Sequence, residues 1–143
     1  MSNISGAILG VDFGLKWVGL AVCDNRQTIA VGAGWLEDIS GRSLARRIRI
    51  EAEERLAKTI LIGQPPIGAR NSERVVAGAN ILAESLRKMG FEVIRWDESY
   101  TTAAVLTDRK RIGGKSSKPK GWLDEAAAIL ILQGYIDNRF GDK

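Results

Sequence analysis

The sequence contains no histidine and a single cysteine among its 143 residues. Without histidine, the chain has neither serine–histidine–aspartate nor cysteine–histidine nucleophile activation, and it has no histidine metal site. One cysteine, Cys23, cannot form an intrachain disulfide or a thiolate zinc cluster. We expect Cys23 to be a small core residue, and any catalysis to depend on carboxylates, lysines, hydroxyls or a hard metal ion.

Long apolar runs are also missing. No stretch approaches the roughly 20 apolar residues that a membrane span needs. The start, "MSNISGAILG", has neither the basic residues nor the apolar segment of a signal peptide. We therefore expect a cytoplasmic protein with no membrane partner. The length favours a single domain over residues 1–143, and the formal charge of +4 is compatible with a polyanionic partner.

Hydrophobic periodicity predicts five strands and four helices. Apolar runs at 7–13, 16–24 and 28–36, joined by short connections, are typical of an antiparallel meander. After the meander, strands are expected at 59–63 and 91–96, and helices at 42–58, 72–89, after 97 towards 111, and at 122–140. In the first helix Leu44, Ile48 and Leu56 would form the apolar face. This order predicts an α/β fold with a mixed sheet flanked by helices, because each helical crossover brings the next strand in parallel.

Asp12 interrupts an apolar strand, "AILGVDFG", where an ionised carboxylate is costly to bury unless something pairs with it. The neighbouring Gly10 and Gly14 leave room for another backbone or a ligand to come close. The alternative is a hairpin in which Asp12 caps the turn before Lys16.

Two further carboxylates occupy positions where ligands commonly bind. Glu98 follows the fifth strand at its carboxyl end, although helix capping by Asp97 or Thr101 explains this acidic pair equally well. Asp124 shares a helix face with Ala127, Ala128, Ile131 and Tyr135 and should point at the sheet, whereas Glu125 should point to solvent. A first-turn residue favoured by the helix dipole is the alternative for Asp124.

Three carboxylates gathered at one site would repel each other strongly. A hard divalent cation with oxygen ligands relieves that repulsion. The sequence therefore predicts a Mg²⁺ or Mn²⁺ site.

The segments "ILGVDFGLKWVGLAVCD", "LIGQPP", "VIRWDESYTT" and "LDEAAAILILQGYID" resemble, in order and spacing, the motifs of the YqgF family of ribonuclease H-like proteins, also described as Holliday-junction resolvase-like. The resemblance implies a ribonuclease H-like five-stranded sheet and a role in trimming the precursor of small-subunit ribosomal RNA. It also implies that Asp12, Glu98 and Asp124 are the catalytic metal ligands. The chain departs from the family pattern at Leu15 and Ser99 and in the loop "GQPPIGARNSER".

With such ligands, two ions about 4 Å apart would be bridged by Asp12, one activating water and the other stabilising the leaving 3′ oxygen. Because a metal lowers the pKa of its bound water, the reaction needs no histidine. A basic segment without acidic residues precedes Asp124 and could hold phosphates, unless it is only a solvated loop. Its basic residues are Arg109, Lys110, Arg111, Lys115, Lys118 and Lys120.

The predicted function is therefore a metal-dependent nuclease acting on precursor ribosomal RNA. Two alternatives stay open: a junction-resolving DNA nuclease, and a non-catalytic RNA-binding factor for ribosome assembly. Divalent-dependent cleavage of RNA or of branched DNA separates the two nucleases. Retained RNA affinity without any cleavage would identify the binding factor.

Overall fold

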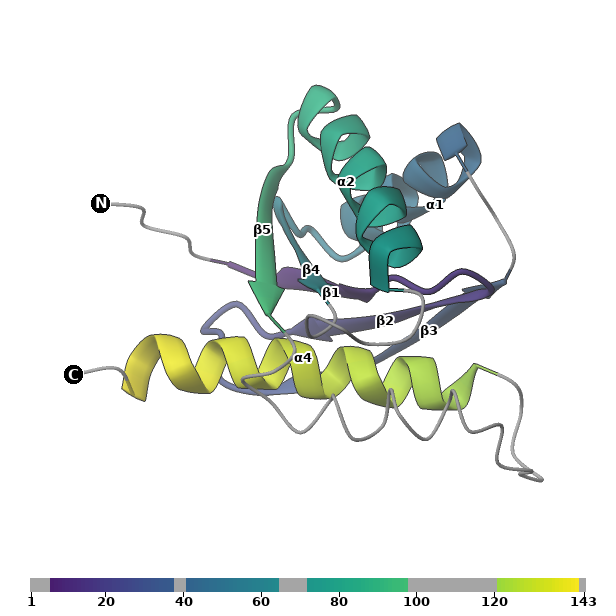
Figure 1. Ribbon diagram of the computed structural model, residues 1–143. Coiled ribbons are helices and arrows are strands. Elements are labelled where there is room, and N and C mark those ends of the chain that lie inside the picture. Colours follow the sequence, from purple (N-terminus) through teal and green to yellow (C-terminus); the bar gives the residue numbers. More distant parts are fainter. Residues whose placement is uncertain (1–5, 38–40, 65–71, 98–120, 142–143) are drawn as a thin grey trace.

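The computed structural model describes residues 6–37, 41–64, 72–97 and 121–141. Five strands form one mixed sheet in the order β3-β2-β1-β4-β5 (Figure 1). The strands are β1 (Ile8–Asp12), β2 (Trp17–Cys23), β3 (Ala30–Glu37), β4 (Thr59–Gln64) and β5 (Glu92–Asp97). The helices are α1 (Gly41–Glu54), α2 (Ser72–Lys88) and α4 (Trp122–Gly141).

The strand directions follow from the lengths of the connections. The short connections make β1, β2 and β3 antiparallel neighbours, whereas the crossovers through α1 and α2 make β4 parallel to β1 and β5 parallel to β4. The predicted fold is confirmed, with every described strand and helix at the expected place in the order. The helix expected after residue 97 lies outside the described residues.

The sheet has a helical layer on each face, with α1 and α2 on one side and α4 on the other (Figure 1). Alternation along β1 assigns its side chains to these layers. Leu9 and Val11 belong to the core under α1 and α2, whereas Ile8 belongs to the core under α4. No described helix is long and apolar enough to cross a membrane.

Two local features stabilise the strands of the meander. In the β2–β3 connection, hydrogen bonds from the N–H groups of Ile29 and Thr28 and from the Thr28 hydroxyl hold the pKa of Asp24 well below its usual range. Cys23 is a buried core residue, as expected, and its Sγ accepts a hydrogen bond from the Ile8 N–H at 3.3 Å. Burial raises the pKa of the Cys23 thiol, which keeps it protonated.

The end of α1 differs from the expectation. The helix ends at Glu54, and Leu56 is 83% exposed instead of lying in the core. Leu56 adopts the left-handed conformation with φ 57°, and the Ala57 N–H donates to the Ala52 carbonyl at 2.8 Å. This is a Schellman motif, so the chain turns back before Leu56 can reach the apolar face, and Ala57 is buried instead.

Replacing Leu56 with Gly should raise the free energy of unfolding by about 0.5–1 kcal/mol, because glycine adopts the left-handed conformation without steric cost. Urea denaturation measures this change. Leu56→Ala is the control, since it removes the exposed side chain but keeps the strained backbone. An equal gain in both variants would attribute the effect to the lost apolar side chain instead.

Candidate active site

Asp12 lies at the carboxyl end of β1 on the face covered by α4. A Cβ at Gly10 would lie 3.0 Å from Cβ of Leu132 in α4, so Gly10 faces that helix, and Asp12, two residues later, faces the same way. Asp12 is only 2% exposed. Its carboxylate is therefore buried at the carboxyl end of β1, on the face that α4 covers.

Asp124 reaches the same place from the first turn of α4. Asp12 pairs with Gly19 on β2, and a Cβ at Gly19 would lie 1.9 Å from the backbone oxygen of Asp124. Only glycine at position 19 lets the helix backbone come this close to the strand. A Cβ at Gly14 would lie 3.7 Å from Oδ1 of Asp124, so this carboxylate lies over the turn that follows Asp12.

Asp124 is 6% exposed, so two buried carboxylates from β1 and α4 lie at one end of the sheet. Their oxygens are the donors that Mg²⁺ and Mn²⁺ prefer, and the pair fits a hard divalent ion. Within residues 6–37, 41–64, 72–97 and 121–141 there is no group of three or more metal-ligating side chains. Glu98, the third predicted ligand, lies outside these ranges, as do all the predicted phosphate contacts from Arg109 to Lys120.

The sequence of the whole chain is similar to that of known proteins. A family model, RuvX, described as Holliday junction resolvase, matches residues 6–138. The chain belongs to the RuvX family. This is the family that the sequence motifs indicate under the name YqgF, so that resemblance is confirmed.

Relatives of this RuvX chain match it along nearly their full length. A protein of Acetivibrio thermocellus is 34% identical over 145 residues, which cover 92% of this chain and 96% of the relative. A protein of Agathobacter rectalis is 36% identical over 134 residues, covering 91% and 94% respectively. Both are named "Putative pre-16S rRNA nuclease".

Solved structures with the same fold include resolvases. T. thermophilus RuvC in complex with a Holliday junction substrate superimposes with a TM-score of 0.62 at 15% identity, covering 96% of this chain and 97% of that chain. The fowlpox virus Holliday junction resolvase gives a TM-score of 0.51 at 13% identity, with 92% and 99% covered. At these identities the likeness shows that this RuvX chain has their fold.

Glu125 does not point to solvent, and that expectation was wrong. It is half-buried, and its Oε2 accepts a hydrogen bond from the Gly34 N–H of β3 at 2.8 Å. A Cβ at Gly32 would lie 2.4 Å from the same oxygen. Since α4 lies across β1, β2 and β3, successive residues of its first turn contact different strands, and both Asp124 and Glu125 face the sheet.

The strand that Glu125 contacts is bulged at this point. The β2–β3 register shifts between Gly19 and Ala21, and Gly34 has a φ of 91°.

A second side chain of α4 contacts β3 further along the helix. Oε1 of Gln133 accepts a hydrogen bond from the Ala30 N–H at 2.9 Å. The eight steps from residue 125 to residue 133 rise about 12 Å along the helix, and the four steps from residue 30 to residue 34 rise about 13 Å along the strand. The two contacts between α4 and β3 therefore match in spacing.

The periodicity of the sequence gave no sign of these contacts between α4 and the meander. The available signal was the glycine content of the strands, with Gly19 in β2 and Gly32 and Gly34 in β3. Glycine within a strand often marks a bulge or a close approach of another backbone. In this RuvX chain it marks both.

Glu125→Ala should lower the free energy of unfolding by about 1–3 kcal/mol, because it leaves the Gly34 N–H without its carboxylate acceptor. Glu125→Gln keeps an acceptor oxygen and should lose less than half as much. Chemical denaturation of both variants measures the difference. Equal losses would show that charge, and not the hydrogen bond to β3, is what Glu125 contributes.

Proposed function

We propose that this chain is a divalent-metal-dependent nuclease that hydrolyses phosphodiester bonds in the precursor of 16S ribosomal RNA. The observation that carries the proposal is the buried pair of Asp12 and Asp124, brought together from β1 and α4. A divalent cation bound by both carboxylates would offset the repulsion between them. The names of the relatives support the ribosomal substrate.

Glu98 would be the third ligand. It follows Asp97, the last residue of β5, and the parallel strands β1, β4 and β5 have their carboxyl ends at one edge of the sheet. One strand separates β1 from β5, so their ends lie about 10 Å apart. Such a span suits carboxylates that surround a metal site rather than contact each other directly.

Each part of the site has a distinct task. Bound Mg²⁺ or Mn²⁺ would supply an activated water and neutralise charge on the leaving oxygen. Asp12 and Asp124 would supply carboxylate oxygens to the cation, and their burial would limit screening of that attraction by bulk water. The basic segment from Arg109 to Lys120 would bind the substrate backbone, and the cytoplasm is the compartment in which such a precursor is found.

Branched DNA is a second candidate substrate, because the family model is described as Holliday junction resolvase and the fold is that of RuvC. Incubation of the purified protein with precursor 16S RNA, single-stranded RNA and a four-way DNA junction, with Mg²⁺ or Mn²⁺ and then a chelator, tests both. We expect metal-dependent cleavage of the RNA. Cleavage of the junction alone would favour the resolvase, and RNA binding without cleavage would favour an assembly factor.

Asp12→Asn and Asp124→Asn should each reduce cleavage by orders of magnitude, because a neutral amide is a poor ligand for a hard cation. Neither should unfold the protein, since loss of a first-turn charge costs at most about 1 kcal/mol at Asp124 and loss of Asp12 removes repulsion. Cleavage rates at several Mn²⁺ concentrations and thermal unfolding measure both effects.

The matched control is Asp137→Asn, which changes an exposed carboxylate on the same helix. Oδ1 of Asp137 accepts a hydrogen bond from Gln133, which an asparagine oxygen can also do. Its cleavage rate should equal that of the wild type. Near wild-type cleavage by Asp124→Asn at low metal would remove Asp124 from the proposed ligands.

Changing Lys115, Lys118 and Lys120 together to Ala should weaken nucleic-acid binding and flatten its dependence on salt. Each lost phosphate contact lowers the slope of log affinity against log salt by about 0.7–0.9. Fluorescence anisotropy over a salt series measures the slope. If affinity and slope are unchanged, these lysines contribute only to solubility.

A further inference from the structure

Two tryptophans lie beside the carboxylate pair on the face of the sheet that α4 covers. Trp35 of β3 pairs with Gly19, the residue on which the backbone of Asp124 rests. Trp17 begins β2, two residues before Gly19, and therefore points to the same face. Both tryptophans are half-buried residues, so neither is fully enclosed by the fold.

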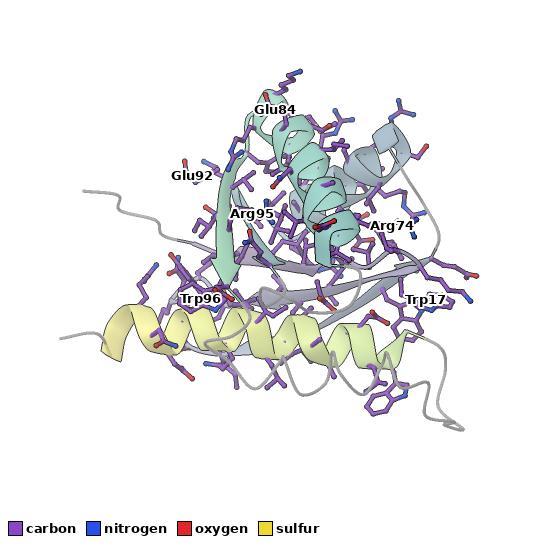
Figure 2. All side chains as sticks on the ribbon, viewed as in Figure 1. Trp17, Arg74, Glu84, Glu92, Arg95 and Trp96 are labelled. Atoms are coloured by element: carbon purple, nitrogen blue, oxygen red, sulfur yellow. The ribbon has the colours of Figure 1, made fainter. Side chains whose placement is uncertain are left out.

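The first turn of α4 restricts the orientation of the Trp35 ring. A Cβ at Gly121 would lie 2.3 Å from Cδ1 of Trp35, so the helix start packs directly on the indole. Gly121 has a φ of 92°, a conformation that suits glycine. Figure 2 shows Trp17 at the end of the molecule where α4 begins.

The ammonium group of Lys16 lies over the Trp17 ring. Nζ of Lys16 lies 5.9 Å from the ring centroid, and the side chain of Lys16 is exposed. Leu15, the preceding residue, is 42% exposed. The turn that follows Asp12 therefore presents apolar surface, an indole and a positive charge next to two buried carboxylates.

This combination suits one class of ligand. Indoles stack on unpaired bases of any sequence, and a neighbouring lysine can contact the phosphates between them. In a duplex the bases already stack on each other and present only their edges.

We propose that Trp17 and Trp35 form a stacking surface for the bases of a single-stranded nucleic acid, with Lys16 contacting its phosphate backbone. The inference rests on the proposed nuclease function and adds that the substrate is unpaired where it passes Asp12 and Asp124. The site therefore selects single-stranded segments of a folded precursor.

Binding is best measured in the Asp12→Asn background, in which the probe stays intact. The probes are a short single-stranded RNA and the same strand annealed to its complement. Adding Trp17→Leu should weaken binding of the single strand roughly tenfold or more, because it removes the ring on which a base stacks. Affinity for the duplex should stay within about twofold.

Trp96→Leu in the same background is the matched control. Trp96 lies on β5 and packs edge-on against Tyr135, with ring centroids 5.4 Å apart, and Figure 2 shows it well apart from Trp17. Its loss should not change affinity for the single strand. Thermal unfolding of each variant identifies any loss of affinity that comes from unfolding.

Two charge variants test the path of the strand independently of the rings. Lys16→Ala should reduce the salt slope of single-strand binding by about 0.7, while Trp17→Leu leaves the slope unchanged. Glu37 of β3 is exposed and pairs with Trp17 of β2. Glu37→Gln should therefore tighten binding, because it removes a negative charge from the proposed path of the strand.

Equal loss of affinity for single strand and duplex in Trp17→Leu, or no loss for either, would overturn the stacking surface. The proposed nuclease function fails on a different result, the absence of metal-dependent cleavage by the wild type. Because the binding assay uses an uncleaved probe, the two outcomes are distinguished.

Discussion

The direct contact between the backbone of α4 and the glycine of β2 is the constraint on which the site depends. A helix normally packs on a sheet through its side chains, which keep the two backbones apart. At Gly19 the missing side chain lets the carbonyl of Asp124 lie against the strand itself. Asp12 is the partner of Gly19, so the same contact brings the two carboxylates together. Any larger residue at position 19 would move the helix, and Asp124 with it.

The bulge of β3 lies beside this close approach. The register of β2 and β3 shifts between Gly19 and Ala21, and in this region the Gly34 N–H donates to Oε2 of Glu125. The hydrogen bond between Gly34 and Glu125 fixes the position of α4 across the sheet, and Gly19 sets the distance between α4 and β2. The arrangement concentrates negative charge at the first turn of α4, where the helix dipole favours it.

The sequence predicts the fold well because its apolar runs have unambiguous lengths and short connections. It also places Asp12 and Asp124 on the correct elements, since both are polar residues at positions where the periodicity demands burial. The prediction for Leu56 is wrong because the helical spacing of apolar residues continues past the end of the helix. The left-handed residue at that end is Leu56 itself, where glycine is usual, so the sequence carries no signal for the turn. The prediction for Glu125 is wrong because helical periodicity assigns only one face of a helix to the core. Helix α4 lies across three strands, so residues on two adjacent faces contact the sheet.

Strand β3 is at the edge of the sheet, yet the N–H groups of Ala30 and Gly34 are bonded to side chains of α4. A free edge is a template on which a strand from another molecule can add. Here an incoming strand would find these two donors occupied and the bulge at Gly34 out of register with any regular partner. The helix that carries Asp124, a proposed metal ligand, thus also protects the sheet against strand-mediated self-association.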